Sequence, residues 1–141
     1  MIWKYMNTLL CNIGEYGVII NQQEEFLIVK LTANKKFLEE KRMLPGGRLQ
    51  ENDEPEAWLQ REVEEETGLK IKVIQPIHVA KRGQKYSVFF LCTVIGKQEV
   101  QLSHEHIESR WVKFSENEII NRHNKNSKIA VDKAEIIWNK K

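Results

Sequence analysis

Residues 44–69 read LPGGRLQENDEPEAWLQREVEEETGL, a glycine break followed by an acidic segment. The Pro-Gly-Gly run at 45–47 is the strongest break in the chain and ends any regular element before it. A helix is predicted after the break, because Asp53 is a typical cap with an acid three residues on and Pro55 suits the first turn. Gly68 supplies the C-terminal stop of this helix.

The acidic segment concentrates negative charge in an otherwise basic chain. Residues 51–66 contain eight acids and one base, Arg61, and so carry −7, whereas the formal net charge of +2 leaves +9 on the other 125 residues. Two interpretations are open: a solvated acidic helix face, or a cation site within a surface that attracts polyanions.

Three glutamates in this segment fall on one face of the predicted helix. Glu62, Glu65 and Glu66 lie within about 100° of arc, since each helical residue turns by about 100°. They repel one another and occupy the last turns, where the helix dipole favours cations. A segment that opposes its own stability indicates a functional constraint. Clustered carboxylates are hard oxygen ligands that suit Mg²⁺ or Mn²⁺.

The other predicted elements indicate an α+β layered fold in a single domain over residues 1–141. They are a hairpin over 15–31 with its turn at 21–24, a loop over 33–42, strands over 69–74, 77–81, 86–95 and 107–114, and helices over 115–121 and 127–138. The strand over 86–95 is nearly all apolar and is expected to be central. The helix over 115–121 carries a second capping box.

Composition limits the class of protein. With 141 residues, 41% of them apolar and 30% charged, the chain suits one folded domain and excludes fibrous and disordered classes. No apolar run is long enough to cross a bilayer, and residues 1–20 lack the apolar core of a signal peptide. Cys11 and Cys92 lie in apolar segments without metal-binding spacing, so both are expected to be buried free thiols. A cytoplasmic location is therefore expected.

Residues 47–69 closely resemble the Nudix box, G-x5-E-x7-R-E-U-x-E-E-x-G-U with U a bulky aliphatic residue, and match eight of its nine defined positions. Residues 105–112, EHIESRWV, resemble a later segment of the same family. The resemblance implies an α/β/α sandwich with a mixed sheet and a loop–helix–loop catalytic motif. It also implies a divalent-metal-dependent enzyme, using Mg²⁺ or Mn²⁺, that cleaves a nucleoside diphosphate linked to another group.

By position, the resemblance assigns roles to individual residues. The implied metal ligands are the Gly46 carbonyl, Glu62, Glu65, Glu66 and Glu105. Glu105 is also a candidate general base, as is Glu62. Arg61 is expected to hold the motif together by pairing with the acid at position 53. The implied reaction is attack by water at phosphorus.

Three residues depart from the family pattern. Asp53 stands where the family has Glu, which shortens the partner of Arg61. Gln50 replaces a frequent acid, and Trp58 replaces a small residue on the helix. None of the three is a principal ligand.

Substrate choice is expected to depend on residues outside the box. Tyr86 lies seventeen residues past Leu69, a position associated in the family with dinucleoside polyphosphates, although it also simply opens an apolar strand. Lys30 and Arg48 are candidate phosphate contacts or solvated bases.

Other side chains have a structural and a functional interpretation. Trp111 and Trp138 fit core positions better than base stacking, and His104 and His106 alone make a weak zinc signal.

Three classes of function remain in competition. The first is a pyrophosphohydrolase acting on a nucleotide-type substrate, as a monomer or homodimer. The second is a catalytically weak or inactive nucleotide- or metal-binding module. Such a module is expected to have lost box glutamates, but this chain keeps all three. The third is nucleic-acid binding. The scattered lysines count against this class, although a capped RNA end stays open as a substrate.

Overall fold

The structure, a computed structural model, describes residues 11–31, 42–50, 52–104, 106–120 and 125–140. Its elements in chain order are β1 (Asn12–Ile20), β2 (Glu25–Leu31), β3 (Arg42–Met43), β4 (Gly46–Arg48), α1 (Pro55–Thr67), β5 (Lys70–Arg82), β6 (Lys85–Ile95), β7 (His106–Lys113), the 3-10 helix η2 (Phe114–Ile119) and α2 (Lys125–Trp138). No helix among these residues is long and apolar enough to cross a membrane.

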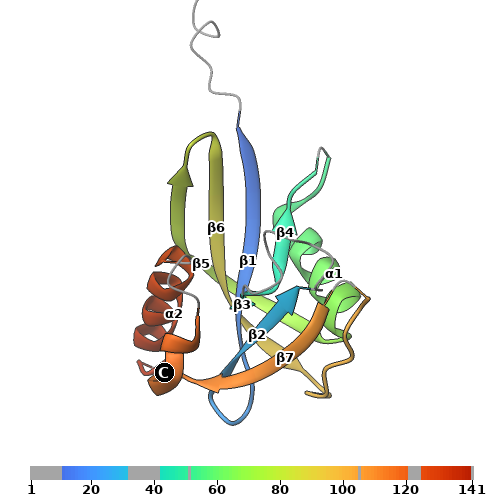
Figure 1. The fold of residues 1–141 in the computed structure, drawn as a ribbon, viewed down its shortest axis with the longest axis vertical. Coiled ribbons are helices and arrows are strands. Elements are labelled where there is room, and N and C mark those ends of the chain that lie inside the picture. The colour runs from blue at the N-terminus through green and yellow to red at the C-terminus, as the bar shows by residue number, and fades with distance from the viewer. Residues whose placement is uncertain (1–10, 32–41, 51, 105, 121–124, 141) are drawn as a thin grey trace, which may run out of the picture.

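The strands form one mixed sheet with the order β3-β2-β1-β6-β5, in which β4 also pairs with β1 and β7 with β2 (Figure 1). Strands β1 and β6 run parallel, and the other pairs are antiparallel. The predicted hairpin is confirmed, because β1 and β2 flank a turn at 21–24. Strand β6 lies between β1 and β5, as its apolar sequence predicts.

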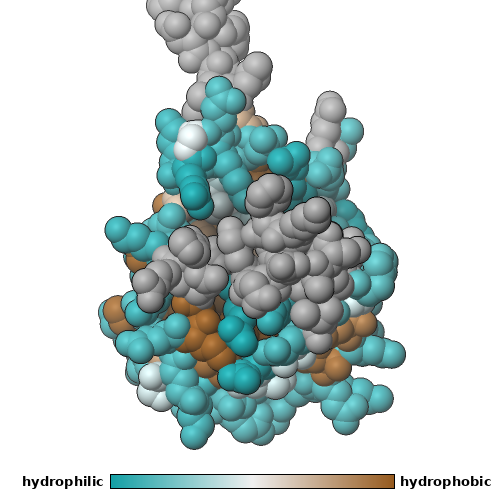
Figure 2. Space-filling view, viewed as in Figure 1, coloured by the Kyte–Doolittle hydropathy of each residue, from teal (hydrophilic) through white to brown (hydrophobic). Residues whose placement is uncertain are grey.

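The two helices cover opposite faces of this sheet, which confirms the α/β/α arrangement (Figure 1). Alternate strand residues point to opposite faces, so each strand contributes to two cores. The core under α2 includes Val18, Ile20, Phe26, Ile28, Phe89, Leu91, Ala130, Val131 and Ala134. The core under α1 includes Ile19, Leu27, Phe90, Cys92, Trp58, Leu59 and Val63. Figure 2 shows hydrophobic side chains gathered beside α2 and toward α1 on an otherwise hydrophilic face.

Several sequence predictions are wrong in detail. The strands expected over 69–74 and 77–81 form the single strand β5, whose register shifts on both sides of Pro76 instead of breaking. Bulges let the strand pass a proline, which cannot donate to the ladder. The loop expected over 33–42 lies outside the described residues apart from Arg42, which belongs to β3.

Both predicted capping boxes are also wrong. Helix α1 begins after Glu54, which makes no side-chain cap bond, and η2 begins after Lys113, again without one. The Asp53 carboxylate is bonded elsewhere, as described below. The Gly68 stop is confirmed, with a left-handed φ of 76°. Cys92 is buried as expected, but Cys11 is exposed, because it precedes the first residue of β1.

Candidate active site

Strand β4 lies just before the acidic motif and pairs antiparallel with β1, which holds this part of the chain against the sheet. Gly46 has φ of 146°, and a Cβ atom there would lie 2.0 Å from the Glu15 carbonyl oxygen. A non-glycine residue could not take this conformation or this close approach. The glycine break read from the sequence therefore has a local cause: only glycine lets β4 pair with β1 at this point.

The three box glutamates share one pocket near the C-terminal end of α1. This pocket has a volume of about 380 Å³ and is lined by Glu62, Glu65, Glu66, Ser103 and His104. Glu66 is only 8% exposed, Glu62 is half-buried and Glu65 is exposed. The Gly46 N–H donates to Oε2 of Glu66 over 3.4 Å. The structure thus brings together three of the predicted carboxylates and the glycine break.

The segment that follows β6 forms one wall of this pocket. The backbone N–H of Gln101 donates to the Thr67 carbonyl at 2.7 Å, and that of Ser103 donates to the Glu66 carbonyl at 3.0 Å. These carbonyls belong to the last turn of α1, which has no partner for them within the helix. The loop therefore satisfies the helix end and holds His104 beside the glutamates. Glu105, the next residue, lies outside the described residues.

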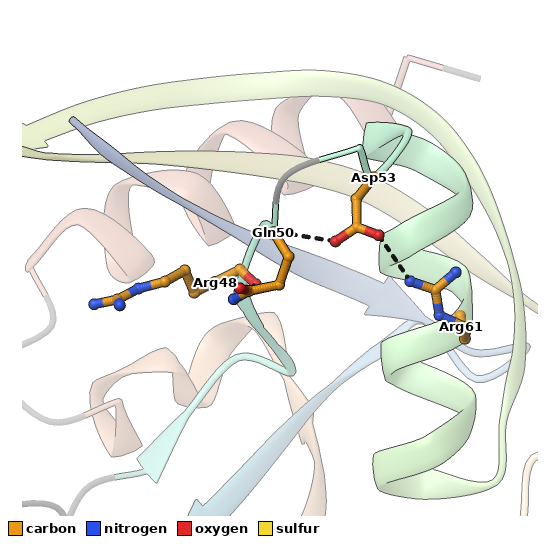
Figure 3. A network of polar contacts seen from close by, with 4 residues as sticks. All are labelled: Arg48, Gln50, Asp53 and Arg61. Atoms are coloured by element: carbon orange, nitrogen blue, oxygen red, sulfur yellow. Dashed lines mark hydrogen bonds and ion pairs between the residues drawn. The ribbon is translucent and has the colours of Figure 1, made fainter. Parts of the chain in front are cut away.

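The predicted pairing of Arg61 with Asp53 is confirmed. Nη2 of Arg61 lies 3.2 Å from Oδ1 of Asp53, while the backbone N–H of Gln50 donates to Oδ2 at 2.9 Å (Figure 3). The carboxylate of Asp53 thus ties the loop before α1 to the middle of the helix. Arg48 lies in the same view with its side chain directed away from this network (Figure 3).

Trp58, one of the departures from the family pattern, is accommodated in the core. It is 3% exposed and packs among the residues under α1. Gly47 faces it, since a Cβ atom on Gly47 would lie 3.6 Å from the Trp58 ring. Trp111 and Trp138 are half-buried against the cores under α1 and α2, which agrees with their interpretation as packing residues.

The proposed substrate contacts do not line the glutamate pocket. Lys30 lies on β2 between two cross-strand neighbours, Arg42 and Glu108, which form an ion pair at 3.6 Å. Tyr86 lies on β6 with the Lys81 ammonium 5.7 Å from its ring centre. Arg48 is exposed on β4, directly after the glycine pair.

One buried acid, Glu15 on β1, was not predicted from the sequence. It is 2% exposed, and its Oε1 has no hydrogen-bond partner among the described residues. Burial, together with repulsion from Asp53 and Glu56, raises the pKa of Glu15 to about 7. The available signal was a single acid within the apolar strand Asn12–Ile20.

The donor chemistry of the pocket fits a hard divalent cation, because carboxylate oxygens are its preferred protein ligands. Within the described part of the chain, no three acidic, histidine or cysteine side chains are already gathered closely enough to hold an ion. Glu66 is held by Gly46, whereas the exposed Glu65 has room to move. The three carboxylates therefore line one pocket, but among the described residues they do not converge closely enough on one point to hold an ion.

Comparison with known proteins agrees with this architecture. No curated protein matches the chain. A MutT protein from Methanosarcina mazei Go1 is 26% identical with a TM-score of 0.71, covering 92% of this chain and 96% of that one. A C. elegans Ap4A hydrolase is 17% identical with a TM-score of 0.76, covering 91% and 99%. An ADP-ribose pyrophosphatase from Streptococcus suis is 18% identical with a TM-score of 0.68, covering 89% and 92%.

The last two likenesses are too distant in sequence to show more than the fold. The family pattern goes further, since the NUDIX domain matches residues 15–133, which include the whole box. The resemblance drawn from residues 47–69 is thereby confirmed. The chain belongs to the NUDIX domain family and is a hydrolase that acts on phosphoanhydride bonds.

Proposed function

We propose that this enzyme hydrolyses the diphosphate linkage of a nucleoside diphosphate attached to another group, in a reaction that depends on Mg²⁺ or Mn²⁺. The observation that carries the proposal is the shared pocket of Glu62, Glu65 and Glu66 at the end of α1, within a NUDIX domain. Carboxylates on one pocket wall can hold cations, and hydrolysis of a diphosphate requires cations to neutralise the charge of its phosphates.

The proposal does not specify the second group attached to the diphosphate. Proteins of similar fold are named for different substrates: Ap4A, ADP-ribose and UDP-X. All of these contain a nucleoside diphosphate. The +9 charge outside residues 51–66 favours a polyanionic substrate of this kind, including a dinucleoside polyphosphate or a capped RNA end.

When bound, the divalent ion neutralises phosphate charge and lowers the pKa of the attacking water. Glu62, Glu65, Glu66 and Glu105, with the Gly46 carbonyl, are the groups we assign to hold it. Glu66 has the most fixed position of these, because it is buried and its carboxylate accepts the Gly46 N–H. Its role is therefore to define where the substrate phosphates lie.

In the chemical step the water oxygen bonds to phosphorus as the bridging P–O bond breaks, and the bonding electrons leave with the departing phosphate. The water proton passes to a carboxylate, for which Glu105 and Glu62 are the two candidates. Arg48 and Lys30 are assigned to phosphates of the substrate that extend beyond the glutamate pocket, which neither residue lines, and Tyr86 to the distal group of a dinucleoside polyphosphate. Arg61 acts through Asp53 as a positioning residue.

The test is product formation from a panel of nucleoside triphosphates, ADP-ribose, nucleotide sugars and dinucleoside polyphosphates, with Mg²⁺ or Mn²⁺ and chromatographic identification of the products. Metal-dependent cleavage confined to diphosphate linkages is expected. Glu66→Gln is the matched inactive variant. Turnover of none of these substrates by a protein that still binds metal would overturn the proposal and favour a nucleotide-binding module. Comparing the pH–rate profiles of Glu105→Gln and Glu62→Gln then identifies the base.

A further inference from the structure

We infer that His104 supplies an imidazole nitrogen to the ion held by the glutamate pocket and so shifts its metal preference from Mg²⁺ toward Co²⁺. This inference rests on the proposed function, because it takes the same pocket as the metal site. His104 is exposed and lines that pocket together with Glu62, Glu65 and Glu66. Of the described residues that line it, His104 alone offers a nitrogen ligand.

The backbone around His104 is fixed at both ends. On one side, Ser103 donates its N–H to the Glu66 carbonyl at 3.0 Å, which ties the loop to α1. On the other side, the His106 N–H donates to the Ser103 carbonyl at 3.2 Å and closes a turn at the start of β7. His104 is the second residue of this turn. Its Cα atom is therefore held close to the helix end that carries the glutamates.

The other described histidines are engaged elsewhere. His106 is 8% exposed, and its Nδ1 lies 3.4 Å from the Ser103 hydroxyl. His78 lies on β5, with Nε2 3.2 Å from Asn126 and Nδ1 3.0 Å from the Lys133 ammonium. The position of His104 is thus specific to the pocket, whereas the other two rings have structural contacts.

Ligand chemistry predicts the consequence. Carboxylate, carbonyl and water oxygens suit Mg²⁺, whereas imidazole suits later divalent metals, whose affinity for nitrogen-containing sites rises from Mn²⁺ to Co²⁺ and beyond. A site of carboxylates alone suits Mg²⁺ and Mn²⁺. Adding one nitrogen strengthens Co²⁺ binding and leaves Mg²⁺ binding almost unchanged.

The experiment measures Co²⁺ and Mg²⁺ binding to the full chain by titration calorimetry, with the visible absorption of bound Co²⁺ as a second readout. The variants are His104→Gln, His104→Asp, which replaces nitrogen by oxygen, and Glu66→Gln. Gln101→Ala, on the same loop, is the matched control because alanine keeps the backbone N–H that donates to the Thr67 carbonyl. Since His104 and Gln101 are exposed, these variants are expected to fold.

His104→Gln is expected to weaken Co²⁺ binding by about 10-fold or more, at least the loss seen when a metal ligand's supporting partner is removed. Mg²⁺ binding should stay within about 2-fold, and His104→Asp should shift preference toward Mg²⁺. Unchanged Co²⁺ affinity and absorption in His104→Gln, or equal losses for both metals, would overturn the inference. If Glu66→Gln still abolishes binding in that case, the proposed function stands. If the wild-type chain binds neither metal, the proposed function is overturned and this inference with it.

Discussion

Helices α1 and α2 have nearly the same length, 13 and 14 residues, and cover opposite faces of one sheet, yet their sequences follow different rules. The buried residues of α2 are Ser127, Ala130, Val131 and Ala134, all of which are small. Those of α1 are Trp58, Leu59, Val63, Glu66 and Thr67. A buried glutamate is unusual in a helix that only packs, because burial penalises its charge.

Charge separates the two helices further. Helix α1 carries five glutamates and one arginine, whereas α2 carries three lysines and two acids. The glutamates of α1 crowd its last turns, where the helix dipole opposes them. Packing explains the sequence of α2, but α1 keeps residues that destabilise it. The sequence of α2 therefore follows from packing alone, whereas the sequence of α1 supports the proposed role of its glutamates in holding a metal ion.

The largest expected effect comes from removing single charges on α1. Glu65→Gln and Glu66→Gln should each lower kcat by about 100-fold or more, since stabilisation of phosphate charge by a held cation amounts to several kcal/mol. Thermal unfolding should be unchanged or shifted upward, because the helix loses a repulsive charge. The measurement is steady-state kinetics beside a melting curve.

Glu135→Gln on α2 is the matched control and should leave kcat and KM unchanged. Wild-type kinetics in both α1 variants would sink the assignment of these carboxylates. It would also remove the distinction between the two helices.

A second prediction concerns the strand beneath α1. Gly46→Ala should lower the free energy of unfolding by about 3 kcal/mol or more, because the new Cβ would meet the Glu15 carbonyl at 2.0 Å in a conformation that alanine avoids. Urea denaturation measures this loss. Gly47→Ala is the control, since its Cβ would make ordinary contact with Trp58 at 3.6 Å. Equal stability of the two variants would show that the close approach of Gly46 to Glu15 does not hold β4 against β1.

Glu15 gives a third prediction, which depends on pH. Its pKa is raised from 4.5 to about 7, so the folded state prefers the protonated acid and loses stability as pH rises between these values. This rise corresponds to about 3 kcal/mol at about 1.4 kcal/mol for each pH unit. Glu15→Gln should therefore match the wild type near pH 4.5 and exceed its unfolding free energy by about 3 kcal/mol at pH 8.

Urea denaturation of both proteins over this pH range gives the difference directly. A difference that stays constant with pH would mean that the Glu15 carboxylate is paired in solution. In that case Asp53 and Glu56, at the start of α1, would not destabilise the fold by repelling Glu15.

The box and its helix could be predicted from the sequence because both depend on local spacing. The faces of the strands followed from alternation, as Phe89 and Phe90 show by entering opposite cores. The pairing of Arg61 with Asp53 was expected from the resemblance, but the capping box at Asp53 is wrong, because Arg61 and the Gln50 N–H bind the carboxylate oxygens that a cap would use. Burial of Glu15 depends on the pairing of β1 with β4, which places Gly47 opposite Glu15 and joins residues far apart in the chain. The anchoring of the loop at Ser103 likewise depends on contact with a helix formed much earlier in the chain.

The smallest expected effects come from one exposed polar tie on each helix. Arg61 and Asp53 pair at 3.2 Å with side chains 55% and 18% exposed, and Asn117 donates to Asp132 of α2 at 2.7 Å. Exposed contacts of this kind contribute about 0–1 kcal/mol, so Arg61→Ala and Asp132→Ala should destabilise the fold by similar small amounts. Only Arg61→Ala should lower kcat/KM, because of the two helices only α1 carries proposed metal ligands.

Asp53→Glu completes the test of this tie. The longer side chain restores the family's residue and can still reach Arg61, so stability should stay equal or rise by about 0.5 kcal/mol with kcat unchanged. Denaturation curves and kinetics of the three variants measure both quantities. A large loss of activity in Asp53→Glu would show that the carboxylate at position 53 does more than hold Arg61. Equal kinetic effects of Arg61→Ala and Asp132→Ala would show instead that the two helices contribute to the active site through stability alone.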